Sequence, residues 1–344
     1  MSKIKLRNSK IIGDFCEPYI VAEVGTNHRG KKEKIYEMID AAKAAGCSCV
    51  KFQSWTVDTL YSKIVYEKNP IAKRMVNSFS LNEEELLDAF SYCQKIGIDF
   101  SSTPYSTSEV DFLVEKCQAP YIKIASMDLN NYPFLDYVAR KNVPIVLATG
   151  MSELSEIEKA VKTIEKTGNK QLCLLHCISI YPPKLETMNI NNIIGLRKRF
   201  PQYPIGLSDH SLGIEVSVAS MALGVCLIEK HLTMDKKAMG WDNDMAMEPD
   251  EFKNLVLCCK NVYKALGNEE RVVEEEELKQ RQKIRRSIVA SKDLKKGTVL
   301  GLDDLDCKRP GTGLPPEKLM SLVGKTLGRD ISYDELIFES DILN

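Results

Sequence analysis

The chain lacks several features that mark whole classes of protein. No run of about 18 apolar residues occurs in its sequence, so no segment is predicted to cross a bilayer. A net charge of −1 gives no electrostatic reason to expect nucleic acid or an anionic membrane as a partner. The segment Met1–Phe15 contains no apolar stretch of the kind found in signal peptides. We therefore expect a cytoplasmic protein.

The eleven cysteines form neither a disulfide framework nor a zinc-finger pattern. Their number is odd, and most of them lie in apolar segments, where cysteine behaves as a small hydrophobic residue. A zinc site at Cys47 and Cys49, or at Cys258 and Cys259, is disfavoured because metal-finger spacing is lacking. This usage is typical of a reducing compartment.

Histidine is scarce, and its distribution is uneven. The four histidines, His28, His176, His210 and His231, all follow or end short apolar segments that are typical of strands. Any one of them alone would most simply be a core or surface residue. Four in the same kind of position indicate that the carboxyl ends of the strands carry the chemistry, as they do in barrel enzymes.

Short β-type segments alternate with amphipathic helical segments over residues 1–268. The expected strands are Tyr19–Val24, Cys49–Gln53, Asp99–Ser102, Tyr121–Ala125, Pro144–Ala148, Leu172–His176, Ile205–Ser208 and Cys226–His231. Gly46, Gly97 and Gly224 lie where three of the helices should end. Alternation of this kind indicates a parallel sheet, and eight such units favour an α/β fold, a (β/α)8 TIM barrel.

Three segments depart from this alternation. Residues 54–80, between the second and third strands, are predicted to form a long loop that is a wall of the active site, with a surface excursion as the alternative. Residues 269–284 are a charge run, predicted to be a solvated helix or linker. Residues 285–344 combine turns with short β segments and are predicted to form a small second domain, whose thin core favours support from a partner surface.

Two lysines lie inside expected strands, with apolar neighbours on both sides. Burying a lysine costs free energy unless an anion neutralises its charge, so Lys51 and Lys123 predict a buried anion. Thr103, Ser126 and Ser208 lie at neighbouring strand ends, and their hydroxyls suit phosphate or carboxylate oxygens. The alternative is that the lysines lie at a surface edge.

His210 and His231 come from neighbouring strands, and Glu229 shares a strand face with His231. Two imidazoles and a carboxylate suit a catalytic divalent metal whose shell is completed by water and substrate oxygens. Such a metal could polarise a carbonyl group. The alternative is that both imidazoles bond the ligand directly, without a metal.

Several of these segments resemble the sialic acid synthase family, which makes nine-carbon nonulosonic acids. The segments in the barrel region are Ala22–His28, Val50–Gln53, Lys123–Ser126, Ala148–Met151, Gly206–Ser211 and Ile228–His231. Arg285–Ser287 and Lys308–Gly313 resemble the antifreeze-like (SAF) domain at the end of these enzymes. The resemblance spans essentially the whole chain and implies a (β/α)8 barrel followed by a SAF domain.

The resemblance also implies a reaction and roles for residues. The family condenses phosphoenolpyruvate with an open-chain N-acylated amino sugar, such as N-acetylmannosamine or a 2,4-diacetamido-2,4,6-trideoxyhexose, and releases phosphate. The residues implied to hold phosphoenolpyruvate are Lys51, Thr103, Lys123, Ser126, Ser179 and Ser208. His210 and His231 would bind Mn²⁺, or alternatively Mg²⁺ or Co²⁺, and Glu229 would assist through water.

The remaining implied residues lie on the sugar side. Gln53, Tyr181, Asp242 and the catalytic Glu23 would face the sugar or the attacking water. Arg309 would reach the sugar across a homodimer, in which the SAF domain of one subunit caps the barrel of the other.

Two departures from the family pattern concern specificity. Trp241 precedes Asp242 in the segment Gly240–Asp244, where the family often has Gly-Pro-Asp-His or Gly-Ser-Asp-His, and Ser179 stands where asparagine is common. The identity of the sugar is therefore left open. Two rivals also remain open: condensation with another aldose, as in heptulosonate or octulosonate synthases, and a non-catalytic carbohydrate-binding protein.

Overall fold

The alternating segments build a parallel barrel in the computed structural model, which describes residues 1–238 and 240–343. The barrel strands are β3 (Tyr19–Glu23), β4 (Cys49–Gln53), β5 (Asp99–Thr103), β6 (Ile122–Ile124), β7 (Ile145–Ala148), β8 (Leu172–Cys177), β9 (Ile205–Asp209) and β10 (Leu227–His231). They follow chain order around one sheet, and its two end strands, β5 and β6, lie against each other. The predicted barrel is therefore confirmed.

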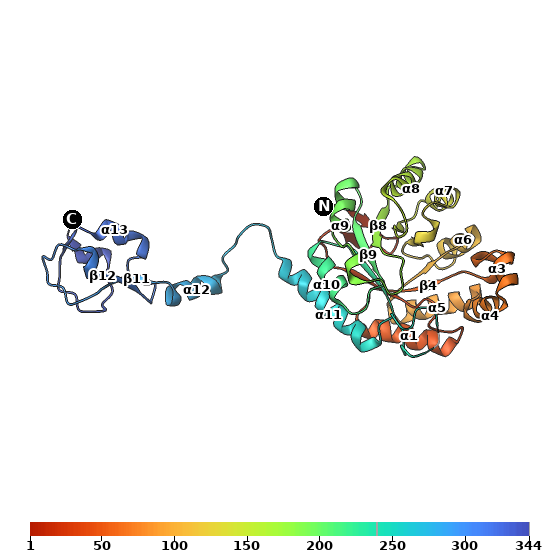
Figure 1. Cartoon of the computed structure of the whole chain (residues 1–344), viewed down its shortest axis with the longest axis horizontal. Coiled ribbons are helices and arrows are strands. Elements are labelled where there is room, and N and C mark those ends of the chain that lie inside the picture. The colour runs from red at the N-terminus through yellow and green to blue at the C-terminus, as the bar shows by residue number, and fades with distance from the viewer. Residues whose placement is uncertain (239, 344) are drawn as a thin grey trace. The chain divides into compact units, whose positions relative to one another are not determined.

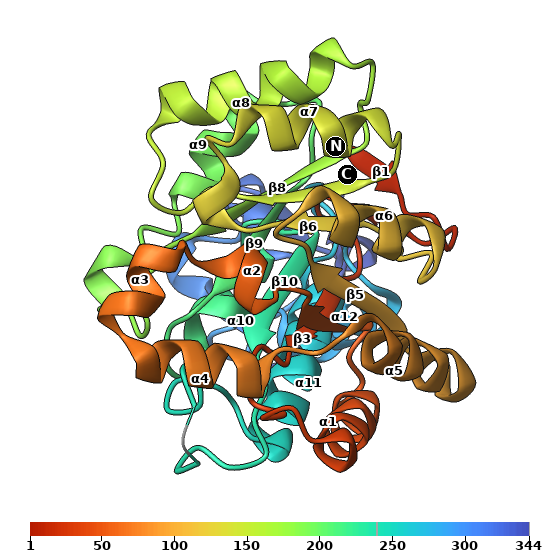
Figure 2. The ribbon, with the colours of Figure 1, turned by 90° about the vertical axis from the view of Figure 1, so that its right-hand side faces the viewer.

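Helices surround these strands (Figure 2). They are α1 (Lys32–Ala45), α5 (Glu83–Ile96), α6 (Thr107–Glu115), α7 (Tyr132–Arg140), α8 (Leu154–Lys166), α9 (Asn192–Arg199), α10 (Glu215–Ala222) and α11 (Pro249–Leu266). Their apolar faces pack on the sheet and leave the charged faces to solvent. Gly46 and Gly97 end α1 and α5 in the left-handed conformation, with φ of 86° and 73°, as the sequence predicted.

The prediction of a long loop at residues 54–80 is wrong, because this connection contains three helices. They are α2 (Val57–Leu60), α3 (Lys63–Lys68) and α4 (Pro70–Phe79). Asn69 caps α4 through a hydrogen bond from the backbone N–H of Ala72 (3.0 Å), and Pro70 starts its first turn. Trp55, Tyr66 and Val76 form a small apolar cluster of their own under these helices.

A hairpin that the sequence analysis did not predict closes the amino-terminal end of the barrel. Its strands, β1 (Lys3–Lys5) and β2 (Ile11–Gly13), pair antiparallel. Ile4, Leu6 and Ile12 pack against inward-facing side chains of the barrel strands, such as Val21 and Val146. This end of the barrel is thus filled by an apolar core, which leaves the carboxyl ends of the strands for polar chemistry.

The chain divides into two compact units, Met1–Gly267 and Asn268–Asn344 (Figure 1). The charge run belongs to the second unit, where it forms the exposed helix α12 (Glu275–Ile284). The rest of this unit has a separate apolar core and contains β11 (Ser287–Ala290), β12 (Leu305–Lys308), α13 (Leu319–Leu322), β13 (Thr326–Leu327) and β14 (Ile342–Leu343). Asn344, the end of the predicted second domain, lies outside the described residues.

None of the described helices is long and apolar enough to cross a membrane.

Candidate active site

The strand register places three charged or polar side chains at one level of the barrel. His231 on β10 pairs with Glu23 on β3, and Glu23 pairs with Lys51 on β4. On the other side of β10, Glu229 pairs with Ser208 on β9. Because side chains alternate between the two faces of a strand, all five point to the barrel interior near its carboxyl end.

These side chains line a cavity of about 360 Å³. The predicted site residues on its wall are Glu23, Lys51, Gln53, Thr103, Lys123, Ser126, Ser179, Tyr181, Ser208, His210, Glu229, His231 and Asp242. Arg309 belongs to the second unit, where it is exposed. Trp55, Leu60 and Tyr61 also line the cavity, so the connection between β4 and β5 does form a wall of it, as helices rather than as a loop.

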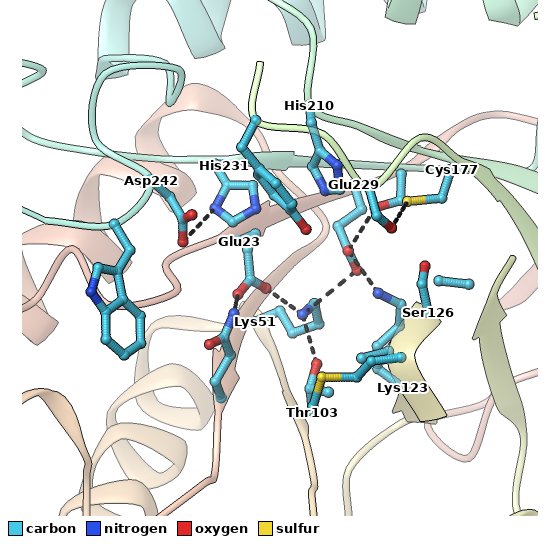
Figure 3. Close-up of a pocket in the computed structure, with 18 of the residues that line it drawn as sticks. Glu23, Lys51, Thr103, Lys123, Ser126, Cys177, His210, Glu229, His231 and Asp242 are labelled. Carbon is cyan, nitrogen blue, oxygen red and sulfur yellow. Dashed lines mark hydrogen bonds and ion pairs between the residues drawn. The ribbon is translucent and has the colours of Figure 1, made fainter. Parts of the chain in front are cut away.

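The two lysines meet carboxylates of the chain itself (Figure 3). Lys51 forms an ion pair with Glu23 and donates a hydrogen bond to the Thr103 hydroxyl (2.9 Å). The Lys123 ammonium lies 2.8 Å from Glu229 Oε1, which also accepts a hydrogen bond from Ser208 (3.2 Å). Both lysines are buried, and in this structure the predicted anions are Glu23 and Glu229.

The two carboxylates differ in their protonation. Burial raises the pKa of Glu23, with repulsion from Glu229 adding to the rise, and the nearby Lys51 does not offset this. Burial also opposes ionisation of Glu229, but the attraction of Lys123 and Lys51 outweighs it and lowers the pKa of Glu229. Glu229 is thus a fixed anion, whereas Glu23 is suited to take up and release a proton.

The imidazoles of His210 and His231 lie close together, with their ring centroids 5.5 Å apart. Burial lowers the pKa of His210 to about 4 and holds that of His231 well below its usual value, so both rings are neutral at pH 7. His210 Nδ1 donates to the Ile178 carbonyl (2.9 Å), which leaves Nε2 as a free acceptor. The ring of Tyr181 stacks on His210 at 4.1 Å.

These two imidazoles fit a divalent ion as a pair of ligands. His231 Nδ1 is buried and has no hydrogen-bond partner among the described residues; Asp242 Oδ2 lies 3.8 Å from it. Residues 1–238 and 240–343 contain no group of three or more His, Cys, Asp or Glu side chains able to hold a metal. An ion held here would therefore take most of its ligands from water or substrate.

The other two histidines lie outside the cavity. His176 is buried, and its Nε2 bonds the Met188 carbonyl (2.7 Å). His28 accepts a hydrogen bond from the Gly30 N–H (2.9 Å) and packs beside Phe52. Their positions at strand ends are thus structural, and only two of the four histidines enter the candidate site.

Smaller groups complete the wall on the lysine side. The Ser126 hydroxyl accepts a hydrogen bond from the Gly150 N–H (3.0 Å). Ser179 lies near the thiol of Cys177 (3.8 Å), which also lines the cavity. Cys177 was not predicted to line the site; its place at the end of β8, one residue beyond the expected strand Leu172–His176, was the available signal.

A second ionic network lies directly behind the site and was not predicted. Asp209 and Lys230 follow Ser208 and Glu229 in sequence, so they face the helices instead of the cavity. The Lys230 ammonium bonds Asp209 Oδ2 (2.9 Å) and the Ser211 carbonyl (2.6 Å). Asp209 also accepts bonds from the Ser211 N–H and hydroxyl and from Ser217.

Comparison with known proteins identifies the family of this barrel. Residues 38–271 match the NeuB family, and residues 285–343 match the SAF domain. The chain belongs to the NeuB family. Its relatives there include synthases of sialic, legionaminic and pseudaminic acids, so it is a member of a family of nonulosonic acid synthases.

Individual relatives cover both units of the chain. An uncharacterized protein of Methanocaldococcus jannaschii is 40% identical over 100% of this chain and 99% of its own length. The N,N'-diacetyllegionaminic acid synthase of Legionella pneumophila is 36% identical, with 96% of each chain covered. Among solved structures, the N-acetylneuraminic acid synthetase of Leptospira borgpetersenii, in complex with citrate, superposes with a TM-score of 0.75 at 32% identity. That match covers 81% of this chain and 95% of the other.

Proposed function

We propose that this NeuB-family protein condenses phosphoenolpyruvate with the open-chain aldehyde of an N-acylated amino sugar and releases phosphate. The observation that carries the proposal is the content of one cavity: two buried lysines beside two neutral, buried imidazoles and a carboxyl group of raised pKa. Each of these groups matches one requirement of the reaction.

The lysine side suits the phosphate and carboxylate of phosphoenolpyruvate. Lys51 and Lys123 would exchange their contacts with Glu23 and Glu229, in part, for ligand oxygens. The hydroxyls of Thr103, Ser126 and Ser208 and the side chain of Ser179 line the same region and can bond the remaining oxygens. Cations on the phosphate also make it a better leaving group.

The imidazole side suits the aldehyde. His210 and His231 are the residues that would hold a divalent ion, Mn²⁺ first among the candidates, with Glu229 assisting through water. Such an ion makes an aldehyde more electrophilic by polarising its carbonyl oxygen. Tyr181 stacks on His210 and fixes its ring, while Gln53 and Asp242 offer hydrogen-bond partners for the sugar hydroxyls.

The bond changes then follow from this placement. The methylene carbon of phosphoenolpyruvate attacks the aldehyde carbon, so that the new C–C bond forms as the π bond of the aldehyde opens. The aldehyde oxygen becomes an alkoxide that takes up a proton from solvent, and positive charge is left on the phosphate-bearing carbon. Water adds to that carbon, and Glu23 takes the proton of the water because its raised pKa makes it a suitable base near neutral pH. The tetrahedral intermediate then breaks its bond from carbon to the phosphate oxygen, while its hydroxyl group loses a proton and becomes the keto group of the product, and phosphate is released.

We also propose a homodimer, in which the SAF domain of one copy covers the cavity of the other and Arg309 contacts the sugar. Arg309 has an exposed side chain, as this role requires. The apolar, exposed side chains of Met127, Met151 and Ile180 at the carboxyl end of the barrel are the kind of surface that a second chain covers.

The test is phosphate release from phosphoenolpyruvate with a panel of aldehydes. The panel contains N-acetylmannosamine, 2,4-diacetamido-2,4,6-trideoxyhexoses and arabinose 5-phosphate, each measured with and without a chelator. We expect release with an acylamino sugar, loss of release with the chelator, and recovery on addition of Mn²⁺. Release with arabinose 5-phosphate alone would favour the octulosonate-type reaction, and no release with any aldehyde would contradict an enzymatic role.

A further inference from the structure

Two aromatic rings, those of Trp55 and Trp241, form a wall at one end of the cavity, and Phe79 packs against Trp241. The ring centroid of Trp241 lies 5.7 Å from that of Trp55, at an interplanar angle of 31°, and 5.9 Å from that of Phe79, which meets it edge-on at 84°. Trp55 is buried at 2% exposure, whereas Trp241 keeps 36% of its surface open. Trp55 and Trp241 both line the cavity, so Trp241 presents an indole to the ligand while resting on a buried aromatic base.

Hydrogen bonds connect this wall to the reacting groups. The Trp55 indole N–H donates to Gln53 Oε1 (2.8 Å), and the Gln53 amide donates to Glu23 Oε1 (3.0 Å). Gln53 therefore has one bond on each side and holds the base of the wall at a fixed position relative to Glu23. A ligand that contacts Trp241 is thereby positioned against the residue proposed to act as base.

The order of groups across the cavity decides which part of the sugar meets the wall. Figure 3 shows Lys123 and Ser126 on one side of the His210 and His231 pair and Asp242 on the other. With phosphoenolpyruvate on the lysine side and the aldehyde at the imidazoles, the remaining carbons of the sugar must extend toward Asp242 and the adjoining Trp241. The far end of the sugar therefore meets indole rings and one carboxyl group.

This end of the cavity suits an uncharged, partly apolar substituent. Pockets lined by aromatic side chains favour methyl and acyl groups, with a few polar groups for orientation. Asp242 lines this end of the cavity together with Trp241, and its carboxylate repels a phosphate. The cations that line the cavity from the described part of the barrel unit, Lys51 and Lys123, lie on the other side of the imidazoles or at Glu23.

We propose that Trp241, packed against Trp55 and Phe79, is a specificity-determining residue that selects an unphosphorylated deoxy sugar with acylamino substituents. A 2,4-diacetamido-2,4,6-trideoxyhexose has this chemistry, because its terminal methyl and second acetamido group replace hydroxyls of N-acetylmannosamine. The inference rests on the proposed condensation with phosphoenolpyruvate and adds the class of sugar that the site accepts.

The test compares kcat/KM for a 2,4-diacetamido-2,4,6-trideoxyhexose, N-acetylmannosamine and N-acetylmannosamine 6-phosphate in the full-length protein with Mn²⁺. We expect the trideoxy sugar to be preferred over N-acetylmannosamine by about 10- to 100-fold, the range that an apolar pocket provides, and the 6-phosphate to be the poorest of the three. Trp241→Ser should reduce the preference about tenfold, while Trp241→Phe, which keeps an aromatic face, should retain most of it.

The ratio of kcat/KM between the two unphosphorylated sugars distinguishes a role of Trp241 in selecting the sugar from a role in supporting the structure alone. Loss of structural support alone would lower kcat/KM for both sugars equally and leave their ratio unchanged, and this result for Trp241→Ser would overturn the inference. Preference for the 6-phosphate in the unmodified protein would overturn it as well, with the condensation itself still standing. Absence of phosphate release with all three sugars would overturn the proposed function and, with it, the inference.

Discussion

Two buried ionic networks lie back to back on β9 and β10, and they differ in whether their bonds are complete. In the helix-facing network, Lys230 and Asp209 are 1% and 0% exposed, and hydrogen bonds from Ser211 and Ser217 occupy the aspartate. In the cavity-facing network, Glu229 Oε2 is buried without a hydrogen-bond partner among the described residues. The first network is saturated, whereas the second has capacity left for a ligand.

The difference shows that burial and charge alone do not identify a catalytic group. Both networks pair a buried lysine with a buried carboxylate in the same barrel, Lys123 with Glu229 and Lys230 with Asp209. Glu229 and Lys230 are consecutive residues of β10. Saturated pairs hold β9, β10 and the turn before α10 in place, because breaking them leaves a buried charge uncompensated. Unsaturated pairs can exchange partners, which binding and catalysis require.

The largest expected effect is on stability, at the saturated network. Lys230→Met should lower the free energy of unfolding by about 3–5 kcal/mol, because the Asp209 carboxylate stays buried without its cation. Both tryptophans of the chain lie in the barrel unit, so tryptophan fluorescence during urea unfolding reports this unit alone. As a control, Lys236→Met removes a surface pair with Glu251 and should cost less than about 1 kcal/mol. Equal losses in the two variants would refute the distinction.

The next effect is on activity, at the unsaturated network. Lys123→Met should reduce kcat/KM for phosphoenolpyruvate by about 10²–10³-fold, the effect expected when one charge-stabilising donor is removed. Its free energy of unfolding should fall by less than half as much as in Lys230→Met, since the cavity admits water to the freed Glu229. Full activity in Lys123→Met, measured as phosphate release, would remove this lysine from the proposed site.

The smallest effect is a pH dependence of binding that the saturated network cannot produce. Glu23, whose pKa is raised, is protonated below that pKa and leaves Lys51 free for the ligand. Above that pKa the carboxylate competes for Lys51, so affinity for phosphoenolpyruvate should fall as pH rises, by at most about tenfold per pH unit. Calorimetric titration can measure this slope. Glu23→Gln controls for ionisation of the ligand itself, and the same slope in both proteins would argue against Glu23.

The barrel was predictable because its signals are local. Apolar strand segments, amphipathic helices and glycines such as Gly46 and Gly97 define each β/α unit without information from the rest of the chain. The helices at residues 57–79 were missed because they are short and mostly exposed, and their stability comes from caps and from packing around Trp55. This connection also contacts residues that are distant in sequence, as Trp55 contacts Trp241, and such contacts cannot be predicted from a local pattern.

The candidate site was predictable to the extent that strand alternation fixes which side chains face inward. Lys51, Lys123 and His231 were expected to face one cavity, and they do. The sequence did not reveal that Glu23 and Glu229 would form ion pairs with the lysines, because that pairing depends on side chains from four different strands. It also gave no sign that Lys230 is buried, since this lysine lies between Glu229 and His231, in a polar segment at the end of the strand.

The alternation along β10 makes the length of this strand critical. Inserting or deleting one residue of β10 before Glu229 would move every following side chain of the strand to the opposite face of the sheet. Lys230 would then point into the cavity, and Glu229 and His231 would face α10. Both networks would be lost in a single step, although no side chain had been replaced. Insertions and deletions are therefore compatible with this fold only in the connections between strands. Sugar specificity can change in these connections, at residues such as Trp241, while the two networks stay intact.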